Sequence, residues 1–184
     1  MRIQSILIAA ALLVPLAAQQ SPLKLDIPGL AAKADAVNDV SLDGAVLKMG
    51  LAFIEKSDYG NDHPVNRRDR DLLSRLKGIY VKSYEFHHNN NPVTPADLAP
   101  LRDQLTHSGF SRIVSARSKR DNESDEVYLH TGDDGNILGL VVISLQSDEL
   151  DLVNIVGRIE PADLVSLGGH LGIPGIEINS KAGH

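Results

Sequence analysis

The sequence predicts an α+β fold: an antiparallel β-meander of about four to six strands with helices packed on it, in a single domain. Two observations support this class. The second half of the chain holds apolar and β-branched runs separated by short clusters of turn-forming residues, which is typical of strands joined by hairpins. The first half mixes helix-like and strand-like segments. The length of 184 residues suits one domain with a sizeable core.

The chain begins with the pattern of a secretory signal peptide. Arg2 precedes an unbroken apolar run over residues 6–14, and small residues follow. This run is too short to span a bilayer comfortably, which argues against the alternative of an uncleaved anchor. We expect cleavage between Ala18 and Gln19, so that residues 1–18 form the signal peptide. The mature protein is then exported, to the periplasm or beyond, and is not an integral membrane protein after signal removal.

The start of the mature chain is expected to be irregular. Residues 19–36 form a lead-in segment, because two prolines and a glycine interrupt them. Weak alternation predicts a short strand over residues 36–42. Asp43 is a suitable N-cap for a helix, since its carboxylate can accept hydrogen bonds from exposed backbone N–H groups. The apolar stripe of this helix continues to Ile54, and a loop rich in turn formers follows over residues 57–66.

Two further helices flank a strand in the middle of the chain. The first of them is predicted over residues 69–77, with leucines facing inward and Gly78 at its end. A strand follows over residues 79–86, and its even positions form one largely aromatic face. After a polar loop, Thr94 is expected to cap the other helix, which has a proline at its first position and continues to Gly109.

The remaining sequence predicts the meander itself, with strands over residues 110–118, 125–131, 137–145 and 150–159. The third of these is apolar on both faces and is expected to be central. In the second, Val127 and Leu129 are predicted to face inward, and Tyr128 and His130 outward. A final helix is predicted from Glu160 to about Leu171. The α+β domain therefore covers residues 37–172, and residues 173–184 form a flexible tail.

Three segments resemble a known family. They are residues 77–86, residues 110–118 and residues 152–159, the last followed by Leu164 and Leu167, and their most specific part is Val153-Asn154-Ile155-Val156-Gly157. Together they resemble the bacterial exported family called domain of unknown function 4252, over about residues 37–171. This resemblance implies a secreted or envelope protein and a loose link to envelope regulation near extracytoplasmic sigma factors. The family has no established activity, so no catalytic residue is carried over, and this chain lacks the cysteine of lipid-anchored members.

The composition excludes several classes of function. The absence of cysteine removes disulfides, thiol nucleophiles, thiolate zinc sites and lipid attachment at cysteine. The net charge of -6 argues against a nucleic-acid partner, because phosphate binding needs a basic surface. The sequence also lacks a nucleophile elbow and a phosphate-binding loop. It therefore predicts no catalytic residue, no cofactor and no assigned metal site.

Histidines are the first group of candidate ligands. His87 and His88 end a predicted strand, and with His130 nearby they are candidate ligands of a metal site of neutral imidazoles. Adjacent residues of a strand point to opposite sides, however, and no fixed ligand spacing is present, which favours a solvated loop. The acidic run over residues 121–126 is interpreted as a charged hairpin turn, because it lacks the glycine and the final acid of a calcium loop.

Arginines are the second group of candidate ligands. Arg67, Arg68 and Arg70 could meet a phosphate, a glycan acid or an acidic partner, although interleaved aspartates favour a solvated helix face. The same two interpretations apply to a second basic group, which consists of Arg112, Arg117, Lys119 and Arg120.

We interpret the sequence as that of an uncharacterised exported protein, a non-enzymatic binding or regulatory module whose partner is an unidentified envelope protein. One alternative is a self-associating structural envelope protein, whose sheet edges pair with another copy. The other alternative is a small secreted hydrolase or metal-assisted enzyme that uses His87, His88 or His130.

Overall fold

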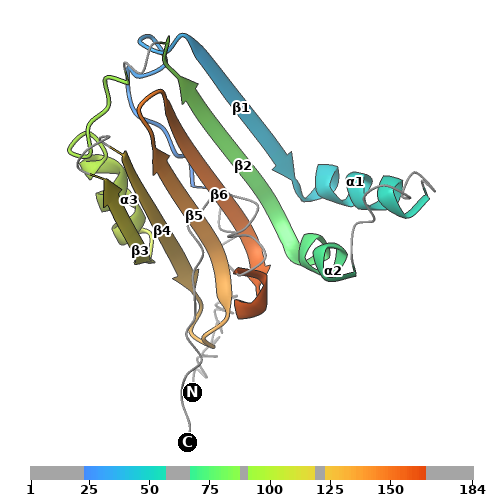
Figure 1. The fold of residues 1–184 in the computed structure, drawn as a ribbon. Helices are drawn as coiled ribbons and strands as arrows, with labels where there is room; N and C mark the ends of the chain where they lie inside the picture. The colour runs from blue at the N-terminus through green and yellow to red at the C-terminus, as the bar shows by residue number, and fades with distance from the viewer. Residues whose placement is uncertain (1–22, 57–66, 88–90, 119–122, 165–184) are drawn as a thin grey trace, which may run out of the picture.

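In the part of the chain that the structure describes, the protein folds into a six-stranded antiparallel sheet with helices at its margins (Figure 1). The computed structural model describes residues 23–56, 67–87, 91–118 and 123–164. In chain order the elements are β1 (Ala36–Asp43), α1 (Gly44–Lys56), α2 (Arg67–Arg75), β2 (Leu76–Glu85), α3 (Ala99–His107), β3 (Phe110–Ser118), β4 (Glu123–Thr131), β5 (Ile137–Leu145) and β6 (Glu149–Ile159).

The predicted α+β class and the meander are confirmed. Strands β3 to β6 pair consecutively, because short turns allow each strand to fold back on the one before it. β5 lies between β6 and β4, as its apolar character on both faces predicts. The sheet then continues beyond β6 through β2 to β1, in the order β1-β2-β6-β5-β4-β3.

Both faces of the sheet carry a hydrophobic cluster. One face, here called the α3 face, carries Tyr84, Tyr128 and Leu152, and it packs against Leu105 of α3 and Leu25 of the lead-in segment. The opposite face carries other buried side chains, among them Val127, Val142, Val153, Leu47 of α1 and Leu72 of α2. Because both faces are buried, the alternation of residues along a strand does not indicate which face meets solvent.

The prediction that Tyr128 faces outward is wrong. Val127 and Tyr128 point to opposite faces of β4, yet both are buried, because each face is covered at this position. His130 is half-buried as well, and its ring contacts that of Phe110 at 5.3 Å between centroids.

The predicted end of the second helix is also wrong. α2 ends at Arg75, and Leu76 already pairs with β6, so Gly78 lies inside β2 and does not end the helix. The register between β2 and β6 shifts at this point. Gly157 permits this close approach: its φ is 143°, and a Cβ there would lie 2.6 Å from the Cα of Leu76.

The helix caps are confirmed in one case and corrected in another. Asp43 caps α1, because its Oδ1 accepts hydrogen bonds from the backbone N–H groups of Ala45 and Val46 at 2.9 and 3.0 Å. Thr94 does not cap α3, which begins four residues after Pro95, at Ala99. Instead, the carboxylate of Asp97 accepts hydrogen bonds from the backbone and side chain of Thr94, both at 2.7 Å, and closes a separate turn.

Several predictions fall on residues outside the described part of the chain. These are the signal peptide over residues 1–18 with its cleavage between Ala18 and Gln19, His88, and the tail over residues 173–184. The final helix is described only over residues 161–164. Within the described residues, no helix is both long and apolar enough to cross a membrane.

Candidate functional site

The most heavily bonded polar group of the α3 face is the carboxylate of Glu126, in the middle of β4. The residue is 2% exposed, so its charge needs close partners. Arg102 of α3 supplies the main one: its Nε lies 3.0 Å from both carboxylate oxygens, and its Nη2 lies 2.5 Å from Oε1. Tyr128 Oη donates a hydrogen bond to Oε2 at 2.6 Å, and Arg112 Nη1 lies 3.4 Å from the same oxygen.

The fold brings these partners together from three elements. Tyr128 follows Glu126 by two positions and therefore shares its face of β4. Arg112 is the direct neighbour of Tyr128 on β3. Arg102 reaches the sheet from α3, and its Nη1 also donates a hydrogen bond to the backbone oxygen of Pro95 at 2.6 Å. Arg102 thus ties the sheet to both α3 and the turn before it.

The charges in this cluster support one another. Burial alone would raise the pKa of Glu126, but the hydrogen bonds from Arg102 and Tyr128 outweigh burial and hold that pKa below its ordinary value. Burial and the hydrogen bond to Glu126 raise the pKa of Tyr128 to about 12. The hydrogen bond to Glu126 raises the pKa of Arg102. Glu126 is therefore a fixed anion, and Arg102 a fixed cation.

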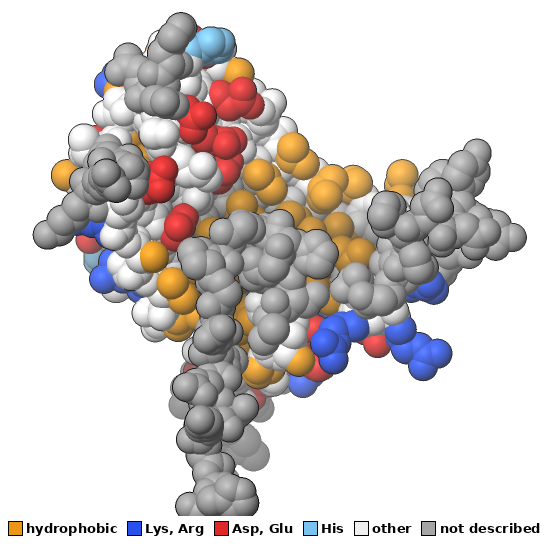
Figure 2. All heavy atoms as spheres, in the orientation of Figure 1, with side chains coloured by type: hydrophobic (Ala, Val, Ile, Leu, Met, Phe, Trp, Pro, Cys, Tyr) orange, Lys and Arg blue, Asp and Glu red, His pale blue; other side chains and the backbone are white. Residues whose placement is uncertain are grey.

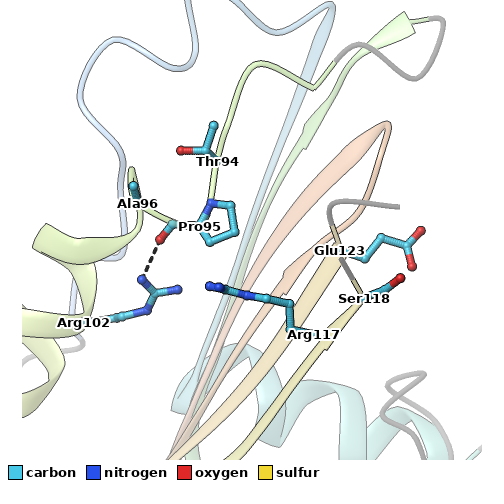
Figure 3. A pocket seen from close by; sticks show the side chains of 7 residues that line it. All are labelled: Thr94, Pro95, Ala96, Arg102, Arg117, Ser118 and Glu123. Atoms are coloured by element: carbon cyan, nitrogen blue, oxygen red, sulfur yellow. Dashed lines mark hydrogen bonds between the residues drawn. The ribbon is translucent and has the colours of Figure 1, made fainter. Parts of the chain in front are cut away.

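A hollow of about 560 Å³ opens beside this cluster, and we call it the arginine hollow (Figure 3). Its walls come from the turn before α3, from α3 itself and from the ends of β3 and β4. The lining residues are Thr94, Pro95, Ala96, Arg102, Arg117, Ser118 and Glu123. Figure 3 shows the guanidinium groups of Arg102 and Arg117 directed toward each other, with the carboxylate of Glu123 turned away from both.

The arginine hollow has the electrostatics of an anion site. Glu126 balances the charge of Arg102, whereas Arg117 forms no ion pair with any described residue. Two guanidinium groups that face each other repel, and an oxyanion between them relieves that repulsion. Guanidinium also presents paired N–H donors that match the oxygens of a carboxylate or phosphate.

The candidate histidines lie in two separate places. His87 follows β2, and its Nδ1 and backbone N–H contact the carboxylate of Asp35 at 3.0 and 2.7 Å. His130 lies on β4 and contacts Phe110. The register places them near opposite ends of the sheet, because β2 ends beside the start of β6, whereas His130 lies in the row of Val156. Among the described residues, no group of three or more histidines or acids could hold a metal ion.

The two predicted basic groups lie in different parts of the structure. Arg67, Arg68 and Arg70 lie exposed on α2, away from the arginine hollow. Of the second group, Arg112 and Arg117 do converge near Arg102, while Lys119 and Arg120 lie outside the described residues.

Sequence reasoning missed the two residues at the centre of the site. Glu126 lies in the predicted strand over residues 125–131 and also ends the acidic run interpreted as a turn, and neither prediction gives its carboxylate a partner. Arg102 is predicted only as part of a helix. One signal in the sequence points to Glu126. It lies two positions before Tyr128 in a strand and therefore on the same face, and because that face is buried its carboxylate has to meet a cation.

The fold and the site define a single α+β domain with a structured cluster of charges and an adjoining anion-competent hollow. The chain belongs to the family described as a domain of unknown function, DUF4252, whose family model matches residues 32–167. Neither a curated protein nor a solved structure matches the chain.

Proposed function

We propose that this protein is an exported, non-enzymatic binding module of the bacterial envelope, which captures its partner through an oxyanion held in the arginine hollow. The observation that carries this proposal is the convergence of Arg102 and Arg117, from α3 and β3, on one hollow. Export is supported by the signal-peptide pattern over residues 1–18.

The chemistry of the groups favours binding over turnover. The carboxylate of Glu126 accepts hydrogen bonds from Arg102, Tyr128 and Arg112, and its lowered pKa makes it a poor general base. A guanidinium holds its proton throughout the ordinary pH range, so it binds and orients anions without acid–base exchange. The site is thus equipped to hold a charged group in place.

The ligand group is a carboxylate or a phosphate, because both offer oxygen pairs to a guanidinium fork. A carboxylate points to an acidic segment of an envelope protein, and a phosphate points to a phosphorylated ligand. Both are tested on the chain without residues 1–18, with a glutamate-rich peptide in one calorimetric titration and inorganic phosphate in another.

Arg117→Gln removes the guanidinium that has no ion pair with the described residues, and it leaves the Arg102–Glu126 pair in place. We expect it to weaken binding of the preferred anion about tenfold. Arg158→Gln on β6 is the matched control, since Arg158 is an exposed strand arginine that does not line the hollow. Equal binding by both variants, or no binding of either anion by the unsubstituted chain, would overturn the proposal.

A second candidate function, self-association, is favoured by the edge strand β1. Among the described strands, β1 pairs with β2 alone, and Val37 and Val40 are 40% and 44% exposed on its two faces. Figure 2 shows hydrophobic side chains gathered over this part of the sheet. The opposite edge strand, β3, has an irregularity between Arg112 and Val114, which disfavours further pairing. Sedimentation equilibrium that detects only monomer at high concentration excludes this candidate; a dimer abolished by Val40→Lys supports it.

A further inference from the structure

A second hollow, of about 330 Å³, lies on the α3 face beneath the lead-in segment, and we call it the lead-in hollow. Leu23 and Leu25 of the lead-in segment form one wall, and Leu152 of β6 contributes to another. Ser41 of β1 and Tyr80 of β2 line its remaining sides. Its size and its mixture of apolar walls with a few polar groups are those of a small-molecule site.

The polar group that makes this hollow unusual is the side chain of Asn154, which lines it from β6. Asn154 is 1% exposed, and its Nδ2 donates a hydrogen bond to the backbone oxygen of Leu23 at 3.1 Å. Its Oδ1 accepts no hydrogen bond from any described residue. A buried carbonyl oxygen that accepts no hydrogen bond is unfavourable, so a donor other than the described residues would stabilise Oδ1 of Asn154.

The charges around the lead-in hollow are already matched. Lys82 Nζ lies 3.3 Å from the carboxylate of Asp26 and 3.8 Å from that of Asp39. Tyr84 Oη donates a hydrogen bond to Asp26 at 2.6 Å. The exposed Lys24 offsets the second carboxylate, so the four charged groups sum to zero. This balance disfavours a charged ligand and separates the lead-in hollow from the arginine hollow, where Arg117 has no described counter-ion.

We infer that the lead-in hollow binds a small, uncharged, largely apolar molecule whose N–H or O–H group donates a hydrogen bond to Oδ1 of Asn154. The leucine walls supply affinity through burial of apolar surface. The single donor supplies orientation and completes the hydrogen bonding of Asn154. This site is independent of the proposed anion capture, because it shares no lining residue with the arginine hollow.

The probe for this site is N-phenyl-1-naphthylamine, an uncharged aromatic amine with one N–H group, whose fluorescence rises in apolar surroundings. We expect saturable binding to the chain without residues 1–18. Ser41→Phe places a ring in the hollow and should lower the affinity at least about tenfold. Val40→Phe is the matched control, because it adds a ring at the neighbouring exposed position, on the opposite face of β1, and should leave binding unchanged.

The role of Asn154 is tested with the N-methyl derivative of the probe, which lacks the N–H group. We expect the unsubstituted protein to bind the derivative about tenfold more weakly, and Asn154→Leu to bind both probes alike. If Asn154→Leu does not fold, the two probes on the unsubstituted chain still decide the question.

Three results would overturn the inference: no saturable binding, equal affinity of Ser41→Phe and Val40→Phe, or equal affinity of the unsubstituted chain for the two probes. Arg117→Gln should bind the probe normally. Probe binding and anion binding can therefore fail separately, so one proposal can be wrong while the other holds.

Discussion

Two glutamates on the same sheet, Glu126 and Glu149, sit in opposite electrostatic surroundings. Burial is the first cause acting on both carboxylates, and in both it raises the pKa. Around Glu126, the hydrogen bonds from Arg102 and Tyr128 reverse the effect of burial, and the pKa is lowered. Around Glu149, the neighbouring charge of Asp151 adds to it, and the pKa is raised. The neighbours therefore decide whether a buried or half-buried acid stabilises this fold.

The surroundings of Glu149 form an acidic end of the sheet, on the face opposite α3. Figure 2 shows the acidic side chains gathered there. One row across β2, β6, β5 and β4 reads Ser83, Asp151, Ser144 and Asp125. Ser83 donates a hydrogen bond to Asp151, and Ser144 donates one to Asp125 at 2.7 Å. These donors are neutral, and no Lys or Arg of the described residues forms an ion pair in this row.

The largest expected effect comes from breaking the Glu126 cluster. Arg102→Met removes the main cation and leaves a buried carboxylate with weaker partners, so we expect the free energy of unfolding to fall by about 3–5 kcal/mol. Urea denaturation followed by circular dichroism measures this change. Arg158→Met, at an exposed strand position, should change the value by less than about 0.5 kcal/mol. A loss below about 1 kcal/mol for Arg102→Met would show that the cluster does not hold α3 to the sheet.

The same substitution at the two glutamates should change the free energy of unfolding in opposite directions. Glu126→Gln loses charge-assisted hydrogen bonds and should lower the free energy of unfolding by about 1–3 kcal/mol. Glu149→Gln removes repulsion from Asp151 and Glu85 and should raise it by up to about 1 kcal/mol, because the site is partly screened by solvent. The two variants are compared by urea denaturation at neutral pH. Changes of the same sign would contradict the contrast between the two regions.

The free energy of unfolding should depend on pH through the titration of both glutamates. Because the pKa of Glu149 is raised above 4.5, the folded state binds a proton more readily than the unfolded state, and stability rises as the pH falls from neutral through that pKa. Because the pKa of Glu126 is lowered, its contribution is complete above 4.5 and is lost as the pH falls through the lowered value.

Urea midpoints measured over this pH range should therefore pass through a shallow maximum on the acid side of neutral. In Glu149→Gln the urea midpoint should no longer rise as the pH falls from neutral, but it should still fall at lower pH. A variant profile identical to that of the unsubstituted chain would mean that Glu149 does not titrate as its acidic surroundings require.

The smallest expected effect is at alkaline pH and belongs to Tyr128. Its pKa is raised from 10.0 to about 12, so its contribution to stability is complete below 10.0 and is lost as the pH rises toward 12. Tyr128→Phe should reduce this alkaline loss, and it should lower stability at neutral pH by about 1 kcal/mol through the lost hydrogen bond to Glu126. Tyr80→Phe is the control, because Tyr80 is not bonded to Glu126. If the free energy of unfolding of Tyr128→Phe falls as steeply at alkaline pH as that of the unsubstituted chain, Tyr128 does not cause the alkaline loss.

The parts of the fold that sequence could predict are those built from local interactions. Asp43 caps α1 through backbone groups two and three residues away, and β3 to β6 pair in chain order through short turns. The error at α2 arose where a distant element intervened. Residues 76 and 77 continue the helical pattern, but β6 offers Leu76 a pairing partner, and Gly157 makes room for it.

The candidate site shows the same division. The sequence grouped Arg112 with Arg117, which are close along the chain, but it could not join them to Arg102, because α3 meets the sheet only in the folded protein. Asn154 belongs to the segment with the most specific family resemblance, yet only the folded chain places its Nδ2 on the backbone oxygen of Leu23 and leaves its Oδ1 without a donor among the described residues.

The sequence by itself therefore determined the α+β class, the membership of the DUF4252 family, the consecutive pairing of β3 to β6, and the cap of α1. Only the tertiary structure decided the placement of β2 and β1 beyond β6, the cluster around Glu126 and the two hollows. The reason is physical. Caps and hairpins depend on neighbours along the chain, whereas a buried charge or an unpaired oxygen depends on which distant segments fold against it.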